Sequence, residues 1–112
     1  MRKRTAAVLL ALAIGAIAAL PVLAATPKIS GSVGPGFTIS LAKKPTKAGK
    51  TTFVIRDRSS IHNFHLRGPG VNKTTSVSAV GSKSFTVTLK KGKYTFLCDP
   101  HPTTMKGSFT IK

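Results

Sequence analysis

Cysteine and acidic residues are nearly absent from this chain: Cys98 is the only cysteine, and Asp57 and Asp99 are the only acids among 112 residues. One cysteine cannot form a disulfide within the chain, which excludes a disulfide-stapled scaffold. In an oxidising compartment such a cysteine is buried and inert, links two chains, or takes part in chemistry. The scarcity of acids leaves 18 Lys and Arg almost uncompensated, with a net charge of +16.

The first 25 residues have the composition of a secretory signal peptide. A basic segment, 2–4, precedes an apolar stretch, 6–20, and Pro21 and a short run of small residues follow. This order marks a chain for export to the periplasm or the outside of the cell. An uncleaved membrane anchor is the alternative, because the apolar stretch is about long enough to cross a bilayer. The alanine-rich composition and Pro21 favour cleavage, which gives a signal peptide at 1–25 and one small domain at 26–112.

The 26–112 segment keeps fifteen Lys and Arg against two Asp, a net charge of +13. Such a field attracts acidic proteins, nucleic acid, or anionic membrane and wall surfaces. We expect no nucleic-acid partner, because the lysines are dispersed along the chain and are not interleaved with aromatic residues. An acidic protein or an anionic envelope surface suits an exported protein better. A basic surface that serves only solubility is the remaining alternative.

Alternation of apolar and polar residues recurs along the 26–112 segment, and Gly or Pro residues separate the alternating runs. Short alternating strands with turn signals between them predict an all-β sandwich or barrel. We expect strands near 28–33, 36–42, 50–56, 61–67, 74–79, 84–90, 92–98 and 107–112. The apolar faces that carry Phe37, Phe53, Phe85 and Phe109 are predicted to form the core.

The residues that carry chemistry gather near the C-terminus, where Cys98, His101 and Met105 lie within eight residues. Thiolate, imidazole and thioether are the soft ligands that select copper. His62 can supply a second imidazole, which completes the two-histidine, one-cysteine set with a weak axial methionine that defines blue-copper sites. Zinc is the competing metal, but zinc has little use for a thioether. A two-copper centre is excluded, because it needs a second cysteine.

Strand parity favours His62 over His65 as the upstream ligand. Successive side chains of a strand point to opposite faces. In the expected strand 61–67, His62 therefore shares a face with Phe64, and His65 faces the other way. By the same rule Cys98 shares the inward face of its strand with the aromatic residues two and four positions before it. A β-bulge would reverse this assignment.

The run from Tyr94 to His101, followed by Met105-Lys106-Gly107-Ser108-Phe109 and preceded by His62-Asn63, resembles the copper loop of the cupredoxins, the plastocyanin and azurin family. The resemblance implies an eight-stranded Greek-key β-sandwich that binds one copper ion at one end and shuttles single electrons between Cu(I) and Cu(II). It implies that Asn63 ties the first histidine's strand to the cysteine loop. It also implies that the edge of His101 reaches the surface amid apolar residues.

Two functional hypotheses follow. The leading one is an exported type 1 copper protein that carries single electrons between redox partners through His62, Cys98, His101 and Met105. The alternative is copper capture and delivery, or a basic binding module that keeps copper as a structural staple. We expect a monomer with acidic redox proteins as partners and no enzymatic activity, because the chain offers no Ser-His-acid arrangement and is too small to enclose a pocket. Asp99 either caps the loop through a backbone N–H or is simply solvated.

Overall fold

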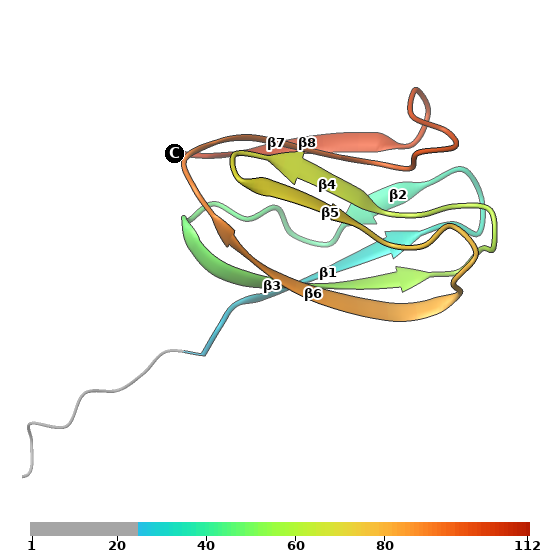
Figure 1. The fold of residues 1–112 in the computed structure, drawn as a ribbon, viewed down its shortest axis with the longest axis horizontal. Coiled ribbons are helices and arrows are strands. Elements are labelled where there is room, and N and C mark those ends of the chain that lie inside the picture. The colour runs from blue at the N-terminus through green and yellow to red at the C-terminus, as the bar shows by residue number, and fades with distance from the viewer. Residues whose placement is uncertain (1–24) are drawn as a thin grey trace, which may run out of the picture.

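The computed structural model describes residues 25–112, so the predicted signal peptide 1–25 lies, but for its last residue, outside the described residues. Eight strands form two four-stranded sheets with the orders β2-β1-β3-β6 and β5-β4-β7-β8, which pack face to face (Figure 1). The strands are β1 (Lys28–Val33), β2 (Ile39–Leu41), β3 (Gly49–Asp57), β4 (His65–Gly68), β5 (Val71–Thr74), β6 (Gly81–Leu89), β7 (Gly92–Leu97) and β8 (Lys106–Ile111). The prediction of an all-β, eight-stranded Greek-key sandwich is confirmed. Residues 25–112 contain no helix that is long and apolar enough to cross a membrane.

The core between the sheets follows from the alternation along the strands. In β3, Phe53 and Ile55 are fully buried while the residues between and beside them are less so. In β7, Tyr94 and Phe96 point inward, and Tyr94 stacks on Phe109 of β8 with ring centroids 5.1 Å apart. Burying each such side chain contributes about 1.5–3 kcal/mol. These contacts fix the ends of the strands, from which the loops described below project.

The predicted strand 61–67 is wrong over its first half, because β4 begins only at His65. The residues at 62–64 are all buried, so the assumed alternation is absent there. Their backbone is held by a neighbouring segment instead: the Phe64 N–H donates to Thr75 Oγ1 (2.8 Å), and the Thr75 N–H donates to the Phe64 carbonyl (2.9 Å). Bonds between two irregular segments therefore replace a regular strand pairing.

Two further strand assignments need correction. The predicted strand 74–79 is wrong: the strand lies earlier, as β5 at Val71–Thr74, and residues 75–80 cross from β5 in one sheet to β6 in the other. The predicted strand 36–42 shrinks to the three residues of β2, since the Gly34 N–H donates to the Thr38 carbonyl (2.8 Å) and closes a turn before it. Phe37 lies on this turn and is 59% exposed, so its assignment to the core is wrong.

The two ends of the sandwich carry different loops. The cysteine end, where Cys98 follows β7, carries the β1–β2, β3–β4, β5–β6 and β7–β8 connections and lies at the right in Figure 1. The distal end, at the left, carries the β2–β3, β4–β5 and β6–β7 connections and the C-terminus. The nine residues of β3 run from one end to the other, which separates them by about 30 Å at roughly 3.3 Å per residue.

Candidate metal centre

The position of Cys98 is set by the end of β7 and by the closed loop that follows. The Cys98 N–H donates to the Met105 carbonyl, the His101 N–H donates to the Cys98 carbonyl, and the Met105 N–H donates to the His101 carbonyl, each at 3.0 Å. Pro100 and Pro102 flank His101 and fix φ on both sides of it. The main chain therefore determines the spacing between the thiol and the imidazole of this loop.

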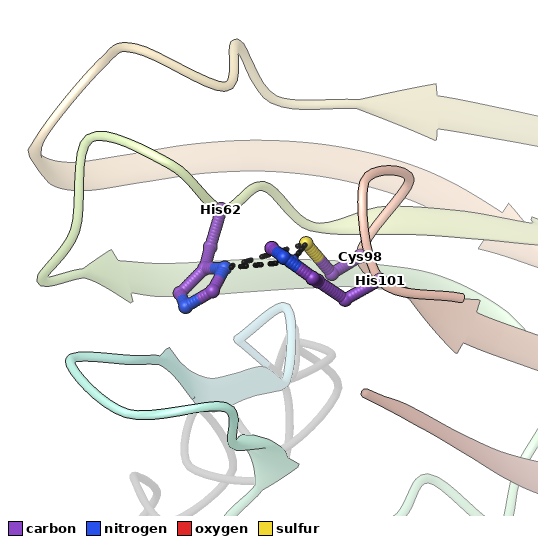
Figure 2. Close-up of side chains that lie close together, drawn as sticks. All are labelled: His62, Cys98 and His101. Carbon is purple, nitrogen blue, oxygen red and sulfur yellow. Dashed lines mark hydrogen bonds between the residues drawn. The ribbon is translucent and has the colours of Figure 1, made fainter. Parts of the chain in front are cut away.

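Three ligand-type atoms from two loops converge at the cysteine end. His62 Nδ1 and His101 Nδ1 each lie 3.7 Å from Cys98 Sγ, and the two nitrogens are 3.2 Å apart (Figure 2). A point within this triangle is about 2 Å from each atom, close to the roughly 2.0–2.3 Å of metal–nitrogen and metal–sulfur bonds. The three side chains thus have the spacing of a trigonal metal site, and two imidazoles with one thiolate are the donors found in blue-copper centres.

Met105 lies at the base of the same loop, with its side chain fully buried. Its backbone closes the loop against both Cys98 and His101. A buried thioether on the loop that carries the thiolate and one imidazole suits a weak axial contact. Met105 stays the predicted fourth ligand.

Asn63 connects the loop of His62 to the loop of Cys98. Its backbone N–H donates to Cys98 Sγ (3.4 Å), and its side-chain amide donates to the Thr75 carbonyl (3.2 Å) and to Asp99 Oδ2 (2.8 Å). In return its Oδ1 accepts the backbone N–H of Asp99 at 2.8 Å. Asn63 is almost completely buried, so these bonds form in a low dielectric, where they are stronger than in water.

His65 lies outside the cluster of ligand atoms. Its Nδ1 bonds Asp99 Oδ1 at 2.8 Å and its Nε2 bonds Asn72 Oδ1, so both ring nitrogens already have protein partners. His62, three residues earlier, is the histidine that meets Cys98. The parity argument for this choice fails in its premise, because His62 is not on a strand. Packing of the buried segment 62–64 directs the His62 ring instead.

Asp99 both caps the loop and bonds the imidazole of His65. Its backbone N–H donates to Asn63, and its carboxylate accepts from Asn63 and pairs with His65. Burial acts to raise the pKa of this carboxyl, but the hydrogen bonds from His65 and Asn63 and the charges of His65 and Arg67 outweigh burial and hold the pKa below its ordinary value. A carboxylate therefore stays ionised next to Cys98 at neutral pH.

Phe37 borders the cluster, although the sequence pattern placed it in the core. Its ring meets His101 edge-on at a centroid distance of 4.9 Å and meets His62 at 5.3 Å. The preceding Gly34-Pro35-Gly36 is a turn signal, and it was the only sequence feature that could have placed Phe37 on a loop. Within residues 25–112, His62 Nε2 is buried without a hydrogen-bond partner. The ring of His62 is thus packed against Phe37, while its Nε2 has no hydrogen bond from a described residue.

The comparisons with known proteins agree with this geometry. A model of the copper-binding proteins of the plastocyanin/azurin family matches residues 38–112. A reduced auracyanin from the photosynthetic bacterium Roseiflexus castenholzii has a TM-score of 0.56 and 21% identity, over 80% of this chain and 99% of the auracyanin. Auracyanin A, a blue copper protein from Chloroflexus aurantiacus, has a TM-score of 0.54 and 14% identity, over 79% of this chain and 100% of the auracyanin. Reduced rusticyanin has a TM-score of 0.57 and 24% identity, over 81% of this chain and 82% of the rusticyanin. A search of the curated proteins finds no match.

The fold is that of a cupredoxin. Because the family model covers well over half of the sequence, the chain belongs to the plastocyanin/azurin family of copper-binding proteins. Its cofactor is one copper ion, which agrees with the histidine–cysteine–histidine cluster in the structure.

Gly34 is the position at which a single methyl group should disturb the cluster. Its φ is +71°, and an added Cβ would lie 3.2 Å from His62 Cδ2 and 3.1 Å from Ser59 Cβ. Gly34→Ala should lower the free energy of unfolding by about 1–2 kcal/mol from the left-handed backbone alone. Because the methyl group also presses on His62, the variant should bind copper more weakly.

Gly36→Ala is the matched control in the same turn, since its Cβ would meet nothing within 4 Å. Its stability should stay within about 0.5 kcal/mol of the wild type. Urea unfolding of the metal-free protein and copper titration measure the two effects. Equal behaviour of the two variants would show that the turn does not constrain His62.

Proposed function

We propose that this protein is an exported single-electron carrier whose copper is bound by His62, Cys98 and His101, with Met105 as a weak axial ligand. The observation that carries the proposal is the triangle of Sγ and two Nδ1 atoms with sides of 3.2–3.7 Å. Membership of a copper-binding family supports it. Bound copper supplies a Cu(I)/Cu(II) couple, and thiolate and thioether favour the reduced ion while imidazoles favour the oxidised one.

The residues around the triangle hold its atoms in place. The loop from Cys98 to Met105 is closed by its own backbone, and the Asn63 N–H donates to the thiolate from the opposite loop. Ligands that are fixed before a change of oxidation state have little to rearrange when it occurs. Such a rigid site suits electron transfer better than metal release, which requires ligands to move apart.

Electrons would leave and enter at His101. Its ring is partly exposed, whereas His62 and Cys98 are fully buried. Among residues 25–112 the large apolar side chains that are exposed are Phe37, Ile61, Val77 and Val80, and all four lie on loops of the cysteine end. An apolar surface around a single accessible ligand suits brief contact with another protein.

For the partners, we propose acidic redox proteins that dock on the cysteine end of a monomer. Arg58 begins the loop that carries His62, and Lys106 follows Met105; both are exposed and lie at the cysteine end. We also propose that the protein works in the periplasm or outside the cell, after removal of residues 1–25, and associates there with an anionic envelope surface. It catalyses no reaction of its own, because His62, Cys98 and Met105 are fully buried and His101 is the one proposed ligand that is partly exposed.

Copper titration of the mature protein tests the ligand set. One equivalent of Cu(II) should produce the intense visible absorption of a copper–thiolate bond. Cys98→Ser should abolish the band, and His62→Ala should abolish it or weaken copper binding strongly. His65→Ala is the control, since His65 bonds Asp99 and Asn72 and should leave the band in place.

The outcomes of this titration separate the alternatives. Loss of the band in His65→Ala with its retention in His62→Ala would reverse the assignment of the upstream ligand. A colourless Cu(I) form that resists oxidation would indicate copper capture and delivery in place of electron transfer.

Met105 is tested by the reduction potential. Met105→Leu should keep the visible band, because the thiolate and both imidazoles remain. The potential should rise, because an axial donor that helps to stabilise Cu(II) is lost. Voltammetry of the two proteins at one pH gives the comparison, and an unchanged potential would mean that the thioether does not act on the metal.

The proposed acidic partner is tested by salt and by the position of charge. Raising the ionic strength from 0.01 to 0.15 M shortens the screening length from about 30 to about 8 Å, so electron transfer to an acidic redox protein should slow. At 0.01 M, where the attraction is least screened, Arg58→Gln with Lys106→Gln should also slow electron transfer. The same charge change at the distal end, Lys43→Gln with Lys44→Gln, should have a smaller effect. Stopped-flow rates that stay flat or rise with salt would contradict basic steering.

A further inference from the structure

The positive charge of this protein is concentrated at the end opposite to the copper site. Of the fifteen Lys and Arg between residues 25 and 112, nine lie on the distal loops or within two residues of the strand ends there, and all nine are exposed. They are Lys28, Lys43, Lys44, Lys47, Lys50, Lys90, Lys91, Lys93 and Lys112. The sequence disperses these lysines over 85 positions, and the fold gathers them on one face.

No Asp or Glu side chain lies on this face. Asp57 ends β3 at the cysteine end and is 2% exposed, and Asp99 follows Cys98 and is paired with His65. Both acids of the chain thus lie at the cysteine end, about 30 Å of strand away from the distal loops. The distal lysines therefore keep their full field toward solvent.

The distal end also offers a shallow depression of about 380 Å³ between the start of β1 and the β2–β3 loop. Its lining includes Lys28, Lys43, Lys44 and Lys47, together with the apolar Pro27 and Pro45. Several ammonium groups around a shallow hollow suit a phosphate-bearing group that carries apolar material with it. A flat array of such groups would contact more of these lysines than one small anion could.

The chain enters the fold at this same end. β1 begins at Lys28, and the apolar stretch 6–20 ends only a few residues earlier in the sequence. An apolar stretch retained as an anchor would therefore hold the distal end, and not the copper end, next to the membrane. An acidic redox protein bound here would lie about 30 Å from His101, too far to exchange electrons by contact.

We propose that the distal lysine face binds the surface of an anionic lipid bilayer and holds the copper end away from it, toward soluble partners. Each Lys near such a surface contributes about 1 kcal/mol, so several acting together give stable but salt-sensitive attachment. This deepens the envelope association proposed above and depends on export. It does not depend on copper, so vesicle binding and the visible band can fail separately.

The test uses the mature protein, residues 26–112. Residues 25–112 form a complete sandwich, and about four fifths of this chain matches two auracyanins over 99% and 100% of their length. At low salt this protein should sediment with vesicles of phosphatidylcholine containing phosphatidylglycerol and not with phosphatidylcholine alone. Lys43→Gln with Lys44→Gln and Lys47→Gln should weaken binding about 100-fold, from about 1 kcal/mol per charge.

A triple variant with the same net charge is the control: Arg56→Gln with Lys73→Gln and Lys83→Gln, all exposed and outside the distal loops. It should bind within a few-fold of the wild type. In NMR spectra of the Cu(I) protein, a gadolinium-chelating lipid should broaden resonances of 42–48 and 90–91 and spare those of His101. Thermal unfolding verifies that all variants are folded.

Three results would overturn the proposal. Equal loss of vesicle binding in both triple variants would show that only net charge matters. Broadening of His101 resonances would place the copper end on the membrane. Tighter lysine-dependent binding to soluble polyglycerol phosphate than to the vesicles would make a wall polymer the occupant in place of the bilayer.

Discussion

The copper site depends on one residue, Asn63, which joins two loops that are otherwise 35 residues apart in sequence. Its backbone N–H donates to Cys98 Sγ, and its side chain exchanges two hydrogen bonds with Asp99. A third bond anchors it to Thr75 on the segment that crosses between the sheets. The pairing of His65 with Leu97 in β4 and β7 brings the two loops side by side, and the bonds of Asn63 then hold His62 and Cys98 at a fixed separation. Because Asn63 is buried, loss of its amide would also leave several polar groups unsatisfied.

The sequence predicted the strands that face the core and the C-terminal loop well, because both depend on local signals. Alternation locates β3, β6 and β7, and the spacing of Cys98, His101 and Met105 is a property of one short loop. It also selected His62, although for a reason that the structure does not support. The actual reason is tertiary: Phe64 and Thr75 bond each other across two irregular segments, and the position of His62 follows from that pairing.

Phe37 shows why the rest could not be predicted. Its alternation with Ile39 and Leu41 is the pattern of a half-buried strand, and local pattern alone assigns it to the core. The turn from Gly34 to Thr38 changes that outcome, because it ends the pairing of β1 and β2 before Phe37 is reached. An exposed ring is then stabilised by the edges of two imidazoles that come from other loops. No periodic pattern in the sequence predicts this contact, because His62 and His101 lie 25 and 64 residues from Phe37.

The fold separates the requirements of the two ends. A site that exchanges electrons by contact needs an accessible ligand edge with an apolar border, and a high density of lysines around it would keep that border hydrated. A surface that holds a small domain at an anionic interface needs many charges at once, and their mutual repulsion costs stability where they crowd together. The sandwich keeps both properties by placing them at opposite ends of its two longest strands, β3 and β6, which are each about 30 Å long. The two acids remain at the cysteine end, where one is buried and the other is tied to Asn63 and His65, so neither one offsets the distal charge.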